Sequence, residues 1–150
     1  MPMYFVQHGQ AVEKEADPDR PLTDEGRREV ERVGACLRHM GLTLRGVYHS
    51  GKTRARQTAE ILTTEVGLDY AFALEGMKPN DDVVKFTEKL EDNCMYVGHL
   101  PHMAKLVSYL VAGDENSGVV AFTNGGVVCV GMDDTGHHIE WVLTPHMCDA

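Results

Sequence analysis

The sequence predicts an α/β protein: a three-layer α/β/α sandwich whose sheet is mainly parallel and ends in an antiparallel hairpin. Two observations predict this fold. Short apolar runs that are typical of buried strands alternate, over most of the chain, with longer segments whose apolar residues recur at helical spacing. The final part contains strand-like runs only, separated by turn-forming residues. The 150 residues, of which 43% are hydrophobic, suffice for the core of one domain spanning 1–150.

The first predicted strand is the apolar run Met3–Val6, which a polar loop follows. Prolines in this loop forbid a continuous helix. A helix is predicted from about Asp24 to Met40, because Thr23 is a suitable N-cap and Gly41 a suitable terminator. Its apolar residues recur at helical spacing, so one face of this helix packs inward.

The middle of the chain predicts a short strand at Gly46–His49 and a helix that Ser50 caps. The apolar residues of that helix share one face. A third helix begins at Asp81 or Asp82, either of which can serve as the N-cap, and runs to about Leu90.

The last third predicts one more strand and helix before the hairpin. The run Cys94–Val97 is a buried strand, and Pro101 suits the first turn of the helix after it. The tail predicts strands at Val119–Thr123, Gly126–Met132 and His138–Leu143, the last two joined by a turn at "DDTG". Alternating strands and helices imply a mainly parallel sheet that is covered on both faces.

The charge of the chain excludes two classes of partner. The net charge of −9 leaves no block of Lys and Arg to neutralise nucleic-acid phosphates or to contact an anionic membrane surface. No apolar run approaches the roughly 20 residues of a membrane span, and no signal peptide is expected. The composition favours a reducing, cytoplasmic location in which the four scattered cysteines stay reduced: Cys36, Cys94, Cys129 and Cys148.

Two histidines follow predicted inner strands in equivalent places. His8 precedes Gly9 at the end of the first strand, and His99 follows the strand "CMYV". Arg54 falls in the first turn of the helix after another strand. Because open α/β sheets gather such side chains in one crevice at their carboxyl edge, the three residues can meet there. Helix N-termini at this edge favour an anion.

The chain resembles the histidine phosphatase superfamily (phosphoglycerate-mutase-like), and within it the short phosphohistidine phosphatases of the SixA type. Four stretches carry the resemblance: "HG" after the first strand, "DRPLTDEG", "S-x-x-x-R-A-x-Q-T" and "GHLPHM". The resemblance implies that His8 is the nucleophile and becomes phosphorylated. It also implies that Arg54, His99 and Arg20 hold the phosphoryl group, with Glu75 as a possible general acid.

One residue departs from the family's pattern. The family has Arg-His-Gly where this chain has Gln7 before His8 and Gly9. An amide keeps an N–H that can reach a phosphate oxygen, but it lacks the charge and fork of a guanidinium. We therefore expect a substrate-binding role for Gln7 and Gly9 in a site that is active but weakened. Without that cation, His8 is expected to hold its proton more readily.

The expected function is that of a metal-independent phosphatase that needs no cofactor, because Arg and His side chains supply the charge that metals supply elsewhere. The expected substrate is phosphohistidine on a protein, since no long insertion could build a lid over the crevice. Two alternatives stay open. One is a phosphatase of a small phosphorylated metabolite, and the other is a degenerate phosphate- or phosphopeptide-binding domain with little turnover.

The remaining histidines have less specific interpretations. His99 and His102 form an H-x-x-H pair that suits zinc, but no third ligand has a recognisable spacing. His102 is expected at the helix surface beside the site. His49 could line the crevice or be structural, while His137 and His138 are expected to be solvated hairpin residues.

Overall fold

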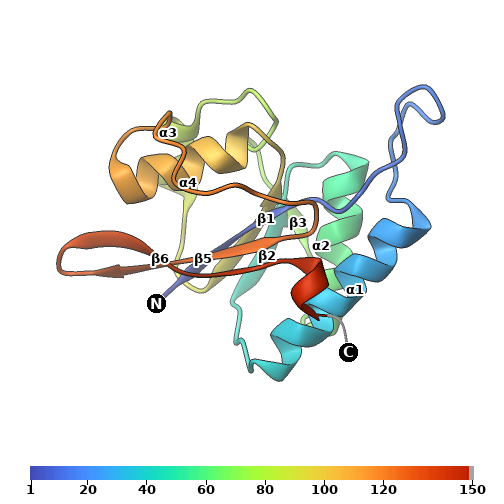
Figure 1. Cartoon of the computed structure of the whole chain (residues 1–150), viewed down its shortest axis with the longest axis horizontal. Coiled ribbons are helices and arrows are strands. Elements are labelled where there is room, and N and C mark those ends of the chain that lie inside the picture. Colours follow the sequence, from blue (N-terminus) through green and yellow to red (C-terminus); the bar gives the residue numbers. More distant parts are fainter. Residues whose placement is uncertain (149–150) are drawn as a thin grey trace.

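A computed structural model describes residues 1–148, which form one six-stranded sheet with helices on both faces (Figure 1). The strands lie in the order β3-β2-β4-β1-β5-β6. The pairs β1–β4, β4–β2 and β2–β3 are parallel, whereas β5 is antiparallel to β1 and β6 is antiparallel to β5. The predicted α/β sandwich with a terminal hairpin is therefore confirmed. The strands are β1 (Met3–Gln7), β2 (Gly46–His49), β3 (Phe72–Ala73), β4 (Cys94–Gly98), β5 (Val127–Asp133) and β6 (Gly136–Leu143).

The helices divide between the two faces of the sheet. On one face lie α1 (Asp24–His39) and α2 (Thr53–Glu65), which pack against each other. The other face carries α3 (Val83–Phe86), a 3₁₀ turn (η1, Thr87–Lys89) and α4 (His102–Ala112). A last 3₁₀ turn (η2, Pro145–Cys148) packs on α1. Within residues 1–148, none of these helices combines the length and apolar character needed to cross a membrane.

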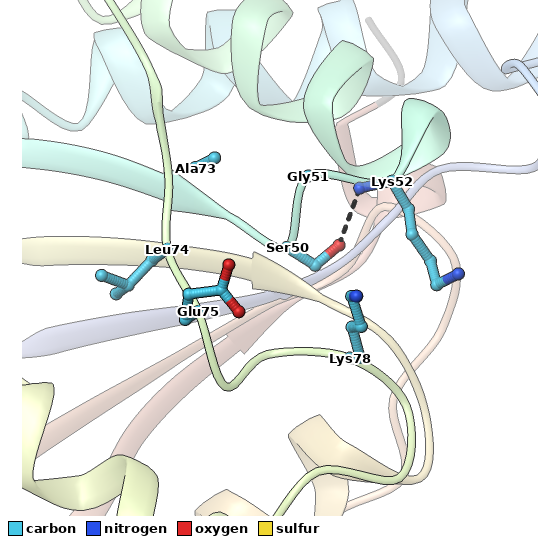
Figure 2. Close-up of a pocket in the computed structure, with 7 residues that line it drawn as sticks. All are labelled: Ser50, Gly51, Lys52, Ala73, Leu74, Glu75 and Lys78. Atoms are coloured by element: carbon cyan, nitrogen blue, oxygen red, sulfur yellow. Dashed lines mark hydrogen bonds between the residues drawn. The ribbon is translucent and has the colours of Figure 1, made fainter.

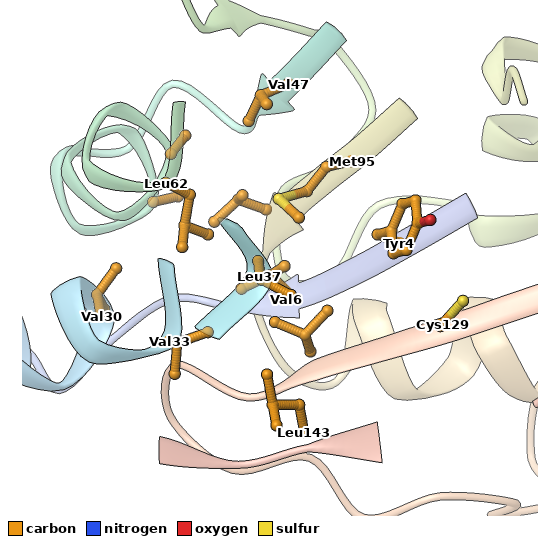
Figure 3. Packing of buried hydrophobic residues seen from close by; sticks show 14 residues of the cluster. Tyr4, Val6, Val30, Val33, Leu37, Val47, Leu62, Met95, Cys129 and Leu143 are labelled. Carbon is orange, nitrogen blue, oxygen red and sulfur yellow. The ribbon is translucent and has the colours of Figure 1, made fainter. Parts of the chain in front are cut away.

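The alternation of side chains along β1 builds two cores. Tyr4 and Val6 face α1 and α2, while Phe5 faces α4, as successive strand residues must. Figure 3 shows the first of these clusters, in which Leu62 of α2 and Val33 of α1 pack over the sheet. Both cores are dry and apolar, so the strands they anchor hold their carboxyl ends in fixed register.

The first helix follows its predicted caps. The Thr23 side chain accepts a hydrogen bond from the Gly26 N–H at 2.9 Å, and the helix ends at His39, one residue before the predicted Met40. Gly41 follows with a positive φ of 74°, which glycine adopts without strain. The third helix also starts where expected, capped by the Asp82 carboxylate.

The structure corrects two strand assignments. The segment Val119–Thr123 is not a strand: it pairs with no strand of the sheet, and β1 and β6 occupy both edges of β5, the next strand along the chain. Its apolar residues instead pack on the second core as irregular chain. Conversely, the two residues of β3 were not predicted, since Phe72 and Ala73 are exposed and form the outer edge beside β2.

Candidate active site

His8 and His99 meet because their strands are neighbours. In the parallel pair β1–β4, Gln7 lies opposite Gly98, so the residues that follow both strands emerge side by side. The His8 N–H donates to the Gly98 carbonyl at 3.0 Å, and the two imidazole centroids are 5.1 Å apart. The two histidines therefore lie side by side at this edge of the sheet, as the sequence predicts.

The hydrogen bonds of His8 select one tautomer. Nδ1 lies 2.7 Å from the Gly9 carbonyl, which can only accept, so the ring proton is on Nδ1. Nε2 then carries a lone pair, and the Arg54 Nε–H donates to it at 3.3 Å. A lone pair on Nε2 is what an attack on phosphorus requires.

Burial keeps His8 neutral. It lowers the pKa of His8 to about 4, against the opposing effect of the Gly9 carbonyl and with further lowering by the charges of Arg54 and Arg20. That His8 holds its proton more readily than it would beside an arginine stays a prediction, but burial and two arginines already keep its pKa well below neutral. At neutral pH the nucleophilic form is already present.

Arg54 and Arg20 bring positive charge to His8 from two different elements. Arg54 stands in the first turn of α2, where no acidic residue competes for its charge. Arg20 sits in the loop before α1 with a positive φ of 48°, an uncommon conformation for a residue with a side chain, and its Nε donates to the Val12 carbonyl at 3.0 Å. Both the His8 and the Arg54 pKa are lowered by the Arg20 charge, so the loop places Arg20 near the predicted site.

Ser50 connects His99 to the turn before α2. Its hydroxyl lies 2.6 Å from His99 Nε2 and accepts from the Lys52 N–H at 3.3 Å. His99 Nδ1 is buried without a partner among residues 1–148, and a buried lone pair is tolerated better than a buried N–H. The favoured arrangement therefore has Nε2–H donating to Ser50, whose own proton is left for another acceptor. Burial, followed by the Arg54 charge, lowers the pKa of His99 to about 3.

Ser50 does not cap α2 as predicted. The helix begins at Thr53, its N-cap is Lys52, and no side chain bonds to the N-terminal turn. The first-turn N–H groups thus stay available to an anion, which is the arrangement that phosphate sites use.

Two side chains of α2 fasten the loops that carry the site. The Gly9 N–H donates to the Thr58 hydroxyl at 2.9 Å in a buried contact, and Thr58 in turn donates to the Arg54 carbonyl at 2.8 Å. The Gln57 side chain accepts from the Leu22 N–H at 2.8 Å, beside the Arg20 loop. One turn of helix therefore sets the positions of three candidate residues.

Gln7 lies beside His8 but its amide has a different partner. Its Nε2 donates to the Asn124 Oδ1 at 2.8 Å, and its Oε1 is buried without a hydrogen bond. The predicted contact from this amide to a phosphate oxygen therefore requires the Gln7–Asn124 pair to open. Gly9 is where the sequence predicts it, buried in the turn after His8.

Glu75 lies in a pocket that Ser50 also lines. Figure 2 shows this pocket of about 380 Å³ between the turn into α2 and the loop after β3. Glu75 and Lys78 reach into it from the loop, and Lys52 borders it on the α2 side. The predicted general acid is thus placed beside the residue that bonds His99.

The other histidines lie outside this arrangement. His102 is fully buried against Phe86, so the prediction of a surface position is wrong. Its place at the start of α4 turns the ring into the second core, away from solvent. His49 is also buried, and its Nδ1 accepts from the Gly51 N–H at 3.0 Å, which makes it structural. His138 is an exposed hairpin residue beside Asp133, as expected.

The described residues contain no cluster of metal-ligating side chains. Over residues 1–148, no three His, Cys, Asp or Glu side chains are grouped so that they could hold an ion. The His99–His102 pair gains no third ligand.

Comparison with known proteins relates the chain to a family. A family model described as histidine phosphatase superfamily (branch 1) matches residues 3–75. This part of the chain is therefore similar to the histidine phosphatase superfamily. A curated relative, an uncharacterised protein of Picosynechococcus sp., is 28% identical over 142 residues that cover 83% of this chain and 86% of that protein.

Two solved structures show the same fold as this chain. The protein histidine phosphatase SixA, complexed with tungstate, superposes with a TM-score of 0.84 at 24% identity and covers 99% of this chain and 100% of its own. The α-ribazole phosphatase of Shigella flexneri has a TM-score of 0.77 at 13% identity, with 97% of each chain covered. The SixA-like fold predicted from the four motifs is therefore confirmed.

Three residues of this site were not predicted from the sequence. Ser50 and Thr58 both belong to the stretch "S-x-x-x-R-A-x-Q-T", so the motif contained a signal for them that was used for Arg54 alone. Asn124 carries no such signal, because its contact with Gln7 joins positions far apart in the sequence.

Proposed function

We propose that this protein is a histidine phosphatase, a metal-independent hydrolase that transfers a phosphoryl group first to Nε2 of His8 and then to water. The observation that carries the proposal is the hydrogen bond from His8 Nδ1 to the Gly9 carbonyl, which leaves Nε2 unprotonated toward Arg54. A pKa of about 4 for His8 keeps this form at neutral pH. The histidine thus needs no separate base to activate it.

In the first step, the Nε2 lone pair of His8 attacks phosphorus opposite the leaving group, and an N–P bond forms as the bond from phosphorus to the leaving group breaks. Arg54 turns its guanidinium from Nε2 to the phosphoryl oxygens, where Arg20 and the N-terminal N–H groups of α2 add positive charge. The Ser50 hydroxyl, fixed by His99, donates to the same group. Glu75 supplies the proton that an alcohol or imidazole leaving group takes up.

In the second step, water attacks the phosphorus of phospho-His8. The N–P bond breaks and its electron pair returns to Nε2. Inorganic phosphate leaves with one proton of the water, and the other proton returns to Glu75. The pocket beside Ser50 gives water a route to phosphorus. A mutase reaction is disfavoured for the same reason, because it needs a site that keeps water out.

The preferred substrate is a phosphohistidine side chain of a protein. The segment 8–23 between β1 and α1 contains no helix or strand of its own that could form a lid, which supports a bulky substrate. The likeness of the fold to a SixA protein histidine phosphatase supports the same choice, whereas the likeness to an α-ribazole phosphatase favours a small phosphorylated metabolite as the second candidate. The four free cysteines fit a cytoplasmic location.

The proposal is tested by trapping the phosphoenzyme. Brief incubation with ³²P-labelled phosphohistidine protein should label the chain with an acid-labile, alkali-stable phosphate, and His8→Asn should abolish the label. His138→Asn, an exposed histidine on the hairpin, is the matched control and should label normally. An acid-stable label, or one that persists in His8→Asn, would contradict the proposal.

Rates on phosphohistidine, phosphoserine and sugar-phosphate substrates then separate the substrate classes. Tight binding of phosphopeptide without turnover would instead identify a binding domain.

A further inference from the structure

The pocket beside Ser50 has more positive than negative charge. Lys52 and Lys78 line it together with a single carboxylate, that of Glu75. Within residues 1–148, neither ammonium group takes part in an ion pair or a side-chain hydrogen bond, and the Glu75 carboxylate likewise has no partner. The nearby Lys89 ammonium is occupied by the Glu75 backbone carbonyl at 2.8 Å. Two cations thus face one anion in a space of about 380 Å³.

This pocket adjoins the candidate phosphoryl site through Ser50. Ser50 lines the pocket and its hydroxyl lies 2.6 Å from His99 Nε2, while the centroids of the tilted His99 and His8 rings are 5.1 Å apart. The charge of Lys52 also contributes to lowering the pKa of His99, so it acts across this boundary. A group in the pocket would therefore belong to the same substrate molecule as a phosphoryl group at His8.

We propose that Lys52 and Lys78 form a subsite for a second anionic group of the substrate, of the carboxylate class, carried by the leaving group. This inference rests on the proposed function, since it takes the phosphoryl position at His8 as given. The chain has a net charge of −9, so the molecule as a whole repels polyanionic substrates. A substrate with two anionic groups can therefore be bound selectively only where cations cluster locally. Arg54 and Arg20 are directed at the phosphoryl group, which leaves the two lysines for the remainder of the substrate.

The charge of Glu75 provides a test of the subsite through ligand affinity. Its carboxylate faces the same pocket and opposes a bound anion, so removal of its charge should strengthen the preference for a second anion. A residue that acted only as a proton donor would leave binding of a ligand without chemistry unchanged. The effect of Glu75→Gln on binding therefore distinguishes the two roles.

The test compares two non-hydrolysable ligands, benzylphosphonate and (4-carboxybenzyl)phosphonate, by isothermal titration calorimetry on the full chain. The native protein should bind the carboxylated ligand about five-fold more tightly, in proportion to a part-exposed ion pair, and added salt should reduce the difference. Lys78→Gln should remove most of this preference and Glu75→Gln should increase it. Lys85→Gln, an exposed lysine of α3 outside the pocket, is the matched control and should change neither value.

The outcomes separate the inference from the function on which it rests. Equal affinity for both ligands, or a preference that survives Lys78→Gln, overturns the subsite and leaves the phosphoryl site intact. Absence of binding by both phosphonates overturns the proposed phosphoryl site and the subsite with it.

Two further substrates identify the source of the anion. A phosphohistidine peptide with Glu next to the phosphorylated residue should be hydrolysed about five-fold faster than its Gln counterpart if the anion is an acidic side chain of a protein. If only the small carboxylated ligand shows a preference, the source is a small metabolite.

Discussion

Arg54 donates from Nε to Nε2 of His8 across 3.3 Å, so the cation that is expected to hold the phosphoryl group also contacts the nucleophile. In the proposed mechanism, these two roles of Arg54 alternate during a turnover. The guanidinium holds the imidazole with its lone pair outward before the substrate binds, and it must exchange this contact for phosphoryl oxygens when the substrate arrives. The same charge disfavours protonation of His8, because a second cation so close is repelled.

Removal of the Arg54 charge should therefore raise the pKa of His8. NMR titration of the His8 ring should give a pKa of about 4 in the native protein and a higher value in Arg54→Gln. Because only the neutral ring can attack, the acidic limb of the kcat profile should move toward higher pH in that variant. Its kcat/KM should fall about 100-fold through the lost charged hydrogen bonds.

Arg56→Gln is the matched control for this titration, since Arg56 is on the same helix but pairs with Glu60 and acts on His49. It should leave the His8 pKa unchanged. A native His8 pKa at or above 6.5 would show that burial does not control this ring.

Thr58 should matter for both stability and rate. Thr58→Val keeps the shape of the side chain but leaves the buried Gly9 N–H without an acceptor, which costs about 1–3 kcal/mol of unfolding free energy. The turn that aims His8 should loosen as well, with a loss of about ten-fold in kcat. Urea denaturation and steady-state kinetics measure the two effects. Thr64→Val, an exposed threonine of the same helix, should show neither of them, and equal losses in both variants would refute the role of the Thr58 contact.

Gln7→Arg should increase the rate. The guanidinium would replace the Gln7–Asn124 hydrogen bond and add a charged, forked donor beside the phosphoryl position. We expect kcat/KM on a generic phosphomonoester to rise about ten-fold, with the acidic limb, already low, moving slightly lower. Gln7→Met, which removes the amide without adding charge, should give no gain. An unchanged or lower rate in a Gln7→Arg protein with a native circular dichroism spectrum would mean that Gln7 belongs to a differently built pocket.

Chelators should leave the rate unchanged, since the proposed mechanism assigns every charge-stabilising role to arginine, lysine, histidine and backbone groups. The measurement is the rate before and after dialysis against EDTA, followed by addition of zinc. A loss of activity that added zinc restores would contradict this prediction and support a metal site at His99 and its neighbour His102.

Periodicity was sufficient to predict most of the fold. The apolar runs of β1 and β4 and the caps of α1 are local signals, and each was found within a residue or two. The strand expected at Val119–Thr123 failed because a β-strand needs a partner edge, and whether an edge is available is a property of the whole sheet. The strand β3 was not predicted for the opposite reason. Its two residues are extended because they pair with β2, and their own sequence pattern does not indicate a strand.

The site divides in the same way. His8 and His99 were predicted together because the ends of inner parallel strands converge at one edge. The partner of Gln7 could not be predicted, since a hydrogen bond to Asn124 depends on how β5 is placed beside β1. The low pKa of His8 could not be predicted for a related reason: the sequence shows that an arginine is missing but not how deeply the ring is buried.

The position of β4 between β2 and β1 has a consequence for how the chain acquires its fold. His8 leaves from β1 and Arg54 follows β2, yet these strands are not neighbours, and the strand that joins them comes later in the sequence. Contacts from α2 join the loops that carry His8, Arg20 and Arg54 within the first half of the chain, but β1 and β2 do not pair with each other. The sheet that supports these loops is therefore complete only when residues 94–98 pair with both strands. Such non-local pairing is slow relative to helix formation, so competence for chemistry should be among the last properties to appear during folding and among the first to disappear on partial unfolding.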